Sequence, residues 1–173
     1  IMLLAIDIGN TNIVLGGFID DELKFVARIA TNQRKTEDEY AAGIKTILLY
    51  SGLDCSAFEG AIICSVVPPL TEIFRSAVEE IIGVRALVVG TGIKTGLNIM
   101  IENPASLGSD IVAASVAAMA EFPLPGIVFD MGTATTITVV DKGNRYIGGA
   151  IVPGVALSMN ALSSGTSLLQ KVP

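Results

Sequence analysis

The residues best suited to chemistry lie in one short pattern that the chain contains twice. Residues 7–12 read Asp-Ile-Gly-Asn-Thr-Asn, and residues 130–136 read Asp-Met-Gly-Thr-Ala-Thr-Thr. In each copy an acid ends an apolar run, a glycine allows close backbone approach, and small polar side chains offer donors. Backbone N–H groups in tight turns hold phosphates, and Mg²⁺ prefers carboxylate oxygens. Two such loops facing each other predict a site for a polyphosphate and its metal.

A purely structural role is the alternative for the first loop, because Gly and Asn are common in hairpin turns for conformational reasons. The repetition favours phosphate binding, since both copies stand at the same place in a repeated three-strand pattern. The sequence contains neither a Walker A loop nor a strand-linked G-x-G-x-x-G motif. We therefore predict that the paired loops form the phosphate site.

A third acid is needed if a hydroxyl group is to attack the γ-phosphate, because a carboxylate must then accept the hydroxyl proton. Asp110 is the candidate, at the first turn of a predicted Ala-rich helix and within Asn-Pro-Ala-Ser-Leu-Gly-Ser-Asp, residues 103–110. A structural role is the alternative here too, since an acid in the first turn stabilises the helix dipole. The chain has no histidine, which excludes Ser-His-Asp triads, Cys-His pairs and His-containing metal sites.

The composition indicates a globular protein of one or two small domains, with 173 residues of which 51% are hydrophobic. This apolar content predicts that some apolar surface contacts a partner subunit or a further segment. Eleven Lys and Arg residues stand against seventeen Asp and Glu residues, a net charge of −6. Because the basic residues are scattered, nucleic acid is not an expected partner.

The cysteines and the apolar stretches favour a cytoplasmic protein. Cys55 and Cys64 form no C-x-x-C pair, and Cys64 lies in an apolar run, which indicates a buried, reduced thiol. Asp7 interrupts the first apolar residues, which lack a basic leader, so we expect no signal peptide. Glycines and Pro153 break the apolar stretch 147–162, and we expect no membrane segment.

The elements that position these residues follow from the apolar patterns. The first half predicts strand, strand, strand, helix, strand, helix, strand (βββαβαβ). Its helices begin after Thr36, which forms a capping box with Glu39, and at Pro68-Pro69. The strands are predicted at residues 2–8, 13–19, 23–30, 61–67 and 86–89.

The second half repeats the opening pattern after a connecting stretch at residues 90–106. A helix is predicted over residues 108–120, and Pro123 prevents its continuation. Three strands follow, the last two joined by a hairpin turn at 141–144. A further helix is expected after Pro153-Gly154. We predict an α/β fold of two lobes, 1–104 and 105–173, the second incomplete. The second set of strands is predicted at residues 126–130, 135–140 and 146–151.

These motifs together resemble those of the type III pantothenate kinases, a branch of the acetate and sugar kinase, Hsc70 and actin superfamily. The resemblance implies duplicated ribonuclease H-like lobes of the actin-like ATPase kind. It covers the whole chain and rests on both Asp-x-Gly loops, Asn103-Pro104 with Gly108-Ser109-Asp110, and a strand-to-helix turn, Ser65-Val66-Val67-Pro68-Pro69.

The resemblance implies ATP-dependent phosphorylation of pantothenate to 4'-phosphopantothenate, the first step of coenzyme A synthesis, by a homodimer. Asp110 would accept the proton, Asp7 would help place Mg²⁺, and Asp130 would bind a monovalent cation, K⁺ or NH₄⁺. The substrate contacts implied are Ile101, Gly108, Ser109, Asp110 and Ile111. The nucleotide contacts implied are Asp7, Ile8, Gly9, Asn10, Thr11, Asn12, Ile13, Val14, Gly132 and Thr133.

Two positions of the substrate segment depart from the family pattern. Ile111 stands where the family usually has Arg, and Ile101 where it usually has Tyr. Both positions are associated with pantothenate, whose carboxylate prefers a cation. Two alternatives therefore stay open: a non-catalytic, nucleotide-binding regulatory homologue, since relatives are also described as accessory factors in transcription, or the same kinase chemistry on another small alcohol.

Overall fold

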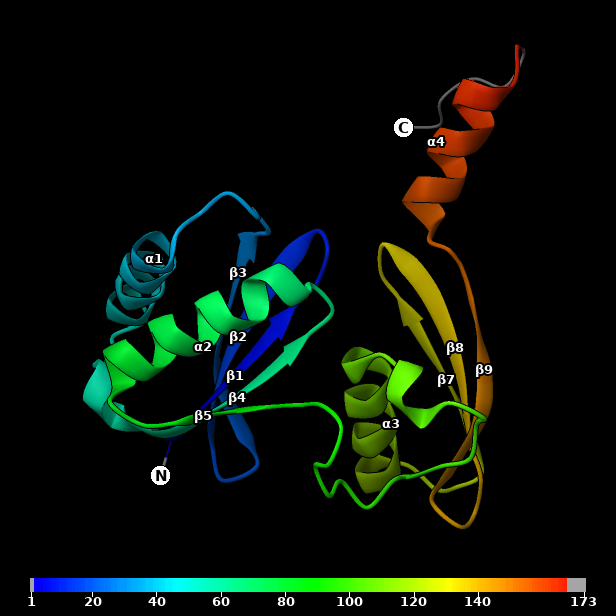
Figure 1. Cartoon of the computed structure of the whole chain (residues 1–173), viewed down its shortest axis with the longest axis horizontal. Coiled ribbons are helices and arrows are strands. Elements are labelled where there is room, and N and C mark those ends of the chain that lie inside the picture. The colour runs from blue at the N-terminus through cyan, green and yellow to red at the C-terminus, as the bar shows by residue number, and fades with distance from the viewer. Residues whose placement is uncertain (1, 168–173) are drawn as a thin grey trace. The chain divides into compact units, whose positions relative to one another are not determined.

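The structure, a computed structural model, describes residues 2–167. The chain divides into two compact units, one up to Ile93 and one from Lys94 onward (Figure 1). The sequence predicts this boundary eleven residues later, after residue 104. Each unit contains its own sheet.

Unit 1 contains a five-stranded sheet of order β3-β2-β1-β4-β5. The first three strands form an antiparallel meander, and β4 and β5 join it in parallel, as expected for βββαβαβ. The strands agree with the predicted positions to within three residues. The elements of unit 1 are β1 (Met2–Ile8), β2 (Asn12–Ile19), β3 (Glu22–Ala30), α1 (Glu37–Tyr50), η1 (Cys55–Ala57), β4 (Phe58–Ser65), α2 (Pro68–Ile82) and β5 (Ala86–Val88).

The core of unit 1 lies between one face of this sheet and its two long helices. Alternate residues of β1, namely Leu4, Ile6 and Ile8, are fully buried in it, as the two-residue period of a strand requires. Tyr40 of α1 and Phe74 of α2 meet there, with ring centroids 4.3 Å apart. This one-sided burial fixes the register of the meander and hence the position of the first loop.

Local signals in the sequence set the starts of both helices of unit 1. Thr36 is the N-cap of α1, and the predicted capping box with Glu39 is present, with the Glu39 carboxylate 2.8 Å from the Thr36 N–H. Proline opens α2, as predicted, and Gly83 ends it in a left-handed conformation with φ of 72°.

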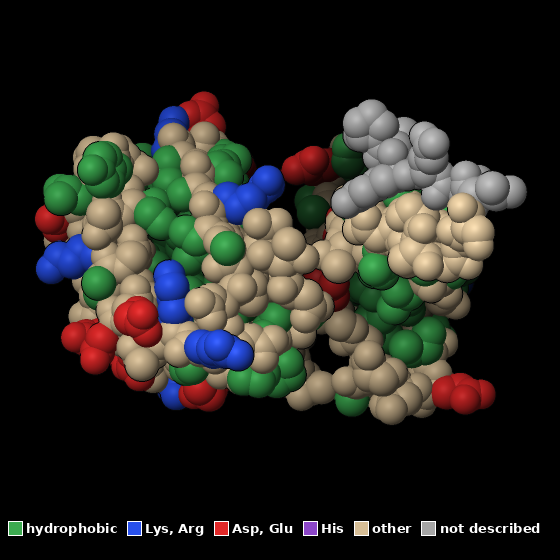
Figure 2. All heavy atoms as spheres, turned by 90° about the horizontal axis from the view of Figure 1, so that it is seen from above, with side chains coloured by type: hydrophobic (Ala, Val, Ile, Leu, Met, Phe, Trp, Pro, Cys, Tyr) green, Lys and Arg blue, Asp and Glu red, His purple; other side chains and the backbone are tan. Residues whose placement is uncertain are grey.

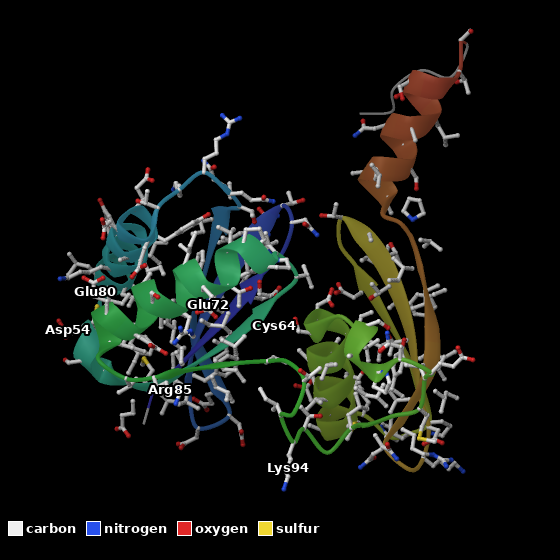
Figure 3. All side chains as sticks on the ribbon, viewed as in Figure 1. Asp54, Cys64, Glu72, Glu80, Arg85 and Lys94 are labelled. Atoms are coloured by element: carbon white, nitrogen blue, oxygen red, sulfur yellow. The ribbon has the colours of Figure 1, made fainter. Side chains whose placement is uncertain are left out.

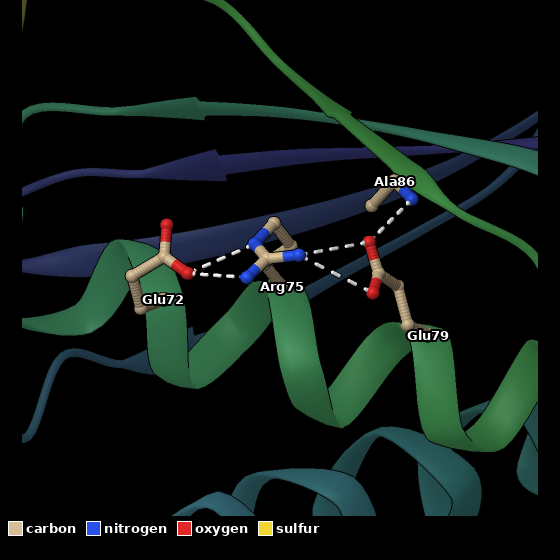
Figure 4. Close-up of polar contacts among 4 residues, drawn as sticks. All are labelled: Glu72, Arg75, Glu79 and Ala86. Atoms are coloured by element: carbon tan, nitrogen blue, oxygen red, sulfur yellow. Dashed lines mark hydrogen bonds and ion pairs between the residues drawn. The ribbon is translucent and has the colours of Figure 1, made fainter.

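A charged network joins α2 to the edge strand β5 (Figure 4). Arg75 lies between two carboxylates: it donates to Glu72 at 2.6 and 2.9 Å and to Glu79 at 3.4 Å. Glu79 in turn accepts the N–H of Ala86 at 3.1 Å. The hydrogen bonds to Glu72 raise the pKa of Arg75. The network fixes the start of β5.

Unit 2 contains a four-stranded sheet of order β6-β9-β8-β7, with α3 packed against it. β7, β8 and β9 repeat the antiparallel meander of unit 1. Residues 98–99 pair in parallel with β9, which is why the stretch 94–104 belongs to unit 2. The elements of unit 2 are β6 (Asn98–Ile99), η2 (Pro104–Ser106), α3 (Ser109–Glu121), β7 (Gly126–Met131), β8 (Ala134–Val140), β9 (Arg145–Pro153) and α4 (Val155–Gly165).

The buried residues of unit 2 lie on α3 and on one face of the sheet. Ile111 and Ser115 are buried on the helix, and Thr138, Val140 and Tyr146 on the strands. Thr138 and Val140 are two residues apart in β8 and so share a face, and Val140 pairs with Tyr146. No residue of α4 is buried.

The surface agrees with the charge pattern expected from the sequence. On the face drawn in Figure 2, Lys and Arg side chains are scattered among acidic ones rather than gathered into one patch. In the part of the chain that the structure describes, no helix has the length and apolar character to cross a bilayer.

Candidate active site

The first loop consists of residues 9–12, because Ile8 of β1 pairs with Ile13 of β2. The Gly9 N–H donates to the Asn12 carbonyl at 3.0 Å, closing the turn. A Cβ on Gly9 would stand 3.0 Å from the same oxygen, so the turn favours glycine there. Thr31, just after β3, donates its N–H to the Thr11 carbonyl at 3.0 Å and its hydroxyl to the Gly9 carbonyl at 2.6 Å. The loop is therefore held at both ends.

The predicted nucleotide contacts of unit 1 separate into an exposed and a buried set. The side chains of Ile8 and Ile13 are fully buried in the core, so only their backbone groups could face a ligand. Gly9 and Val14 are half-buried. The exposed set, which can present oxygen and nitrogen atoms to a ligand, comprises Asp7, Asn10, Thr11 and Asn12.

The end of the neighbouring strand β4 is tied to this loop. The Val66 N–H donates to the Ile8 carbonyl at 3.0 Å, and Asp7 pairs with Cys64, which lies at the end of β4 (Figure 3). Ser65 Oγ accepts the hydroxyl of Thr71 at 2.9 Å. Asp7 thus lies where the carboxyl ends of two parallel strands meet, the usual place for ligands in open α/β sheets.

The second loop, residues 132–134, resembles the first but is one residue shorter. Met131 pairs with Thr135, and the Gly132 N–H donates to the Ala134 carbonyl at 3.0 Å. Gly154, the first residue after β9, donates its N–H to the Thr133 carbonyl at 3.0 Å. This bond is the counterpart of the one from Thr31 to Thr11. Asp130, Gly132 and Thr133 are all exposed.

Gly154 is a structural residue of this loop that the sequence did not reveal as part of the site. A Cβ at this position would overlap the carbonyl oxygens of Gly132 and Thr133 and stand 2.8 Å from the carbonyl carbon of Thr133. The residue is buried against the loop. The sequence contains no local signal for it, because the predicted strand ends at residue 151 and the need for glycine comes from the loop that Gly154 packs against.

Each loop offers a single carboxylate, which fits a metal ion whose other ligands are mainly phosphate oxygens and water. Among residues 2–167, no group of three or more Asp, Glu, Cys or His side chains is gathered as a metal site. Mg²⁺ commonly binds one or two carboxylates together with substrate phosphates. Asp7 and Asp130, each at the end of the first strand of its meander, supply one carboxylate per loop.

Asp110 lies in the first turn of α3, as predicted from the sequence. Its Oδ1 accepts the N–H of Ile111 at 2.8 Å, and its carboxylate lies over the α-carbon of Gly108, the N-cap residue. The side chain is half-buried, and Ser109 beside it is half-buried as well.

A pocket of about 170 Å³ brings together three of the five residues of the predicted substrate segment: Ile101, Gly108 and Ile111. Asp110 contacts two of its lining residues, so its carboxylate lies beside the pocket. None of the lining residues is charged, and the volume is below the range of about 300 to 1,000 Å³ usual for ligand sites. The remaining lining residues are Ser106, Leu107, Ile137, Tyr146, Gly149, Ala150 and Ile151.

Tyr146 and Gly149 are wall residues of this pocket that the sequence did not identify. Tyr146 is 5% exposed, and a Cβ on Gly149 would stand 3.2 Å from its hydroxyl oxygen. Both lie on β9, far along the chain from Ile101, and no local pattern connects them. The available indication in the sequence was that Tyr146 is an aromatic residue at the start of a predicted strand.

Comparison with known proteins assigns the chain to a family. A sequence model described as type III pantothenate kinase matches residues 3–173. The chain belongs to the type III pantothenate kinase family. Curated members are 42% identical in Moorella thermoacetica and 45% identical in Brevibacillus brevis, each over 171 residues. These matches cover 99% of this chain and 67% of each relative, so the chain spans about two thirds of their length.

Solved structures confirm the predicted fold class. The ethanolamine utilization protein EutJ from Carboxydothermus hydrogenoformans matches with a TM-score of 0.53 at 17% identity, over 95% of this chain and 57% of that protein. A Ppx/GppA phosphatase from Aquifex aeolicus matches with a TM-score of 0.53 at 15% identity, over 98% and 56%. At such identities the likeness concerns the fold alone. The predicted kinase family is confirmed by the sequence relatives.

Proposed function

We propose that the protein carrying this chain is a type III pantothenate kinase, which transfers the γ-phosphoryl group of ATP to the hydroxyl of pantothenate. The observation that carries the proposal is the family match over residues 3–173, because it spans both Asp-x-Gly loops and the Asp110 segment. The reaction yields ADP and 4'-phosphopantothenate, the first intermediate of coenzyme A synthesis.

In the proposed reaction, the two loops bind the phosphates of ATP. Gly9 and Gly132 bring backbone close to the phosphate oxygens, and the hydroxyls of Thr11 and Thr133 donate to them. The hydrogen bonds from Thr31 and Gly154 hold both loops in place before ATP binds. Such preorganisation spares the cost of ordering the loops when the ligand arrives.

Asp110 accepts the proton of the acceptor hydroxyl in this proposal. The freed oxygen forms a bond to the γ-phosphorus while the bond from that phosphorus to the β,γ-bridging oxygen breaks, and ADP leaves. The support is local: the carboxylate is half-buried, lies at a helix N-terminus and contacts Gly108 and Ile111 of the pocket wall. These contacts also restrict its orientation.

Metal ions complete the proposed site. Mg²⁺ would neutralise charge on the phosphates of ATP, with Asp7 as its carboxylate. Asp130 would hold a monovalent cation, K⁺ or NH₄⁺, a role that rests on the family resemblance and on its exposed position at the end of β7. Replacement of K⁺ by Na⁺ should lower the turnover of the wild type. It should have little effect on Asp130→Asn, whose turnover is already low.

The proposal includes a cytoplasmic homodimer. The support for an association surface is the set of large apolar side chains exposed on unit 2, among them Phe122, Ile127 and Phe129. The support for a reducing compartment is that Cys55 is a free thiol. Sedimentation of the full-length protein measures the oligomeric state directly.

The test is the product formed by full-length protein from pantothenate and ATP. We expect a species with the mass of phosphorylated pantothenate, and ADP release that depends on pantothenate. Tight ATP binding with no product from any pantothenate-like alcohol would instead support the regulatory homologue. Asp110→Asn should keep ATP binding and lose about a hundredfold or more in rate.

The pocket favours one specific alternative, a neutral alcohol as acceptor. Its described lining is uncharged, and Ile111 is 7% exposed where the family usually has Arg. A carboxylate in such surroundings is costly unless a cation accompanies it. Parallel assays with pantothenate and with its amide, which lacks the carboxylate, distinguish the two. A ratio of kcat/KM that favours the amide by tenfold or more supports the alternative.

A further inference from the structure

Tyr40, a buried tyrosine of α1, carries a hydroxyl group that the packing of the core does not require. Its side chain is 1% exposed, and its ring packs against Phe74 in the core of unit 1. Phenylalanine would fill the same space. A buried tyrosine hydroxyl needs hydrogen-bond partners, and the place of those partners in the chain shows what the group holds in position.

The Tyr40 hydroxyl holds the backbone of a single residue, Asn32. It donates to the Asn32 carbonyl at 2.9 Å and accepts the Asn32 N–H at 3.1 Å. Asn32 lies in the segment that joins β3 to α1 (Figure 1). The same carbonyl accepts the N–H of Lys35 at 3.2 Å, and the side-chain oxygen of Asn32 accepts the N–H of Arg34 at 2.9 Å. The segment is thus a compact turn that one phenol group anchors to the core.

Thr31, the residue before this anchor, makes two hydrogen bonds to the first loop. Its N–H donates to the Thr11 carbonyl at 3.0 Å, and its hydroxyl donates to the Gly9 carbonyl at 2.6 Å. A third carbonyl of the loop, that of Asn12, accepts the Gly9 N–H at 3.0 Å. Three of the four carbonyl groups of residues 9–12 therefore accept hydrogen bonds from the protein itself.

The engaged carbonyls matter for a loop that binds an anion. Such a loop must turn its N–H groups, rather than its carbonyl oxygens, toward the phosphate. A carbonyl held by a protein donor cannot turn toward the ligand without losing that bond. Thr31 holds two carbonyls in this way, whereas glycine at position 154, its counterpart beside the second loop, has no hydroxyl to offer. The first loop therefore depends on a side chain of the adjoining turn.

We propose that Tyr40 is a positioning residue for ATP, a role that rests on the proposed binding of ATP by the first loop. Its hydroxyl fixes Asn32 and hence Thr31, and Thr31 keeps the carbonyls of the loop turned away from the phosphates. The capping box at Thr36 fixes the first turn of α1 and so places Tyr40 beside Asn32. Tyr40 itself does not touch the nucleotide. It lowers the cost of ordering the loop around the phosphates.

Calorimetric titration of the full-length protein with ATP and Mg²⁺ measures the consequence. Tyr40→Phe, which removes only the hydroxyl, should raise the Kd for ATP by about threefold to tenfold, the change that follows from loss of a net hydrogen bond. Thr31→Val should raise it by about tenfold or more, and Thr31→Ser, which keeps the hydroxyl, should restore most of the affinity. The double variant of Tyr40→Phe and Thr31→Val should bind no more weakly than Thr31→Val alone, because both changes act through the same bonds.

Ile44→Val is the matched control for a change in the core beneath α1. Ile44 is fully buried on the same helix, so the substitution should lower the urea midpoint while the Kd for ATP stays unchanged. Amide hydrogen exchange without ATP gives a second measurement. The N–H groups of Gly9 and Thr31 should exchange about fivefold faster or more in Tyr40→Phe, and at the wild-type rate in Ile44→Val.

Wild-type affinity for ATP in Tyr40→Phe would overturn the proposal, and so would losses that simply add in the double variant. A wild-type protein that does not bind ATP would overturn the proposed function instead. The exchange measurement then still decides whether Tyr40 holds the loop: unchanged exchange at Gly9 and Thr31 in Tyr40→Phe overturns that role with or without ATP.

Discussion

Gly154→Ala is a substitution for which the structure predicts a large effect from a single added methyl group. The new Cβ would stand 2.8 Å from the carbonyl carbon of Thr133 and closer still to the oxygens of Gly132 and Thr133. Ordinary van der Waals contact begins at 3.4 Å. Both obstacles are backbone atoms, which cannot rotate away as the end of a side chain can.

The size of the effect follows from the required movement. Relief of the clash needs the loop or the start of α4 to shift by more than half an ångström, which also strains the 3.0 Å bond from the Gly154 N–H to the Thr133 carbonyl. Overpacking of this kind costs about 1–3 kcal/mol. We expect the free energy of unfolding of unit 2 to fall by that amount, and the affinity for ATP to fall by about tenfold or more.

Two assays on the same samples measure these effects: urea unfolding followed by circular dichroism, and ATP binding by calorimetry in the presence of Mg²⁺. Gly43→Ala is the matched control. Gly43 lies within α1, and a Cβ there meets nothing within 4 Å. The same chemical change should raise stability by about 0.5–1 kcal/mol, because alanine is the better helix former. It should leave ATP binding unchanged.

A Gly154→Ala variant with wild-type stability and wild-type ATP affinity would refute the reasoning, since the loop would then have adapted without cost. A loss of stability with unchanged affinity would refute only the link between Gly154 and the nucleotide.

Three further predictions concern the framework. Phe74→Ala should lower the free energy of unfolding by about 3–5 kcal/mol in urea titrations, because Phe74 is fully buried against Tyr40; a loss below 1 kcal/mol would contradict its place in the core. Thr36→Ala should cost about 1 kcal/mol by the same measurement, and Thr36→Ser should restore most of it. The hydrogen bond from Arg145 lowers the pKa of Asp141. The pair therefore stabilises the folded state above about pH 4, and this stabilisation is lost as the pH falls through the lowered pKa of Asp141. Wild type and Asp141→Asn should therefore differ in urea midpoint at pH 7 and converge in strong acid; a constant difference would argue against the pair.

Much of the fold could be predicted because its signals are local. Alternating apolar residues give the meanders, Thr36 and Glu39 form a capping box, and Pro68 opens α2. The repeated Asp-x-Gly pattern correctly predicted a loop after the first strand of each meander. Each of these features depends on residues that lie close together in the sequence.

The features that were not predicted depend on contacts between distant residues. β6 has only two residues, Asn98 and Ile99, and exists because it pairs with β9, so the stretch containing it gave no strand signal. The need for glycine at Gly154 comes from the loop it packs against. The pocket joins Ile101 to Tyr146, and only the sheet brings them together.

A single-turnover experiment tests the central claim most directly. Full-length protein in excess over γ-labelled ATP is mixed with pantothenate, and the label is followed into the product. We predict transfer of the label to a species with the mass of phosphorylated pantothenate, and a rate at least about a hundredfold lower for Asp110→Asn at unchanged ATP affinity. Label that stays in ATP, or transfer at the wild-type rate by Asp110→Asn, would contradict the account.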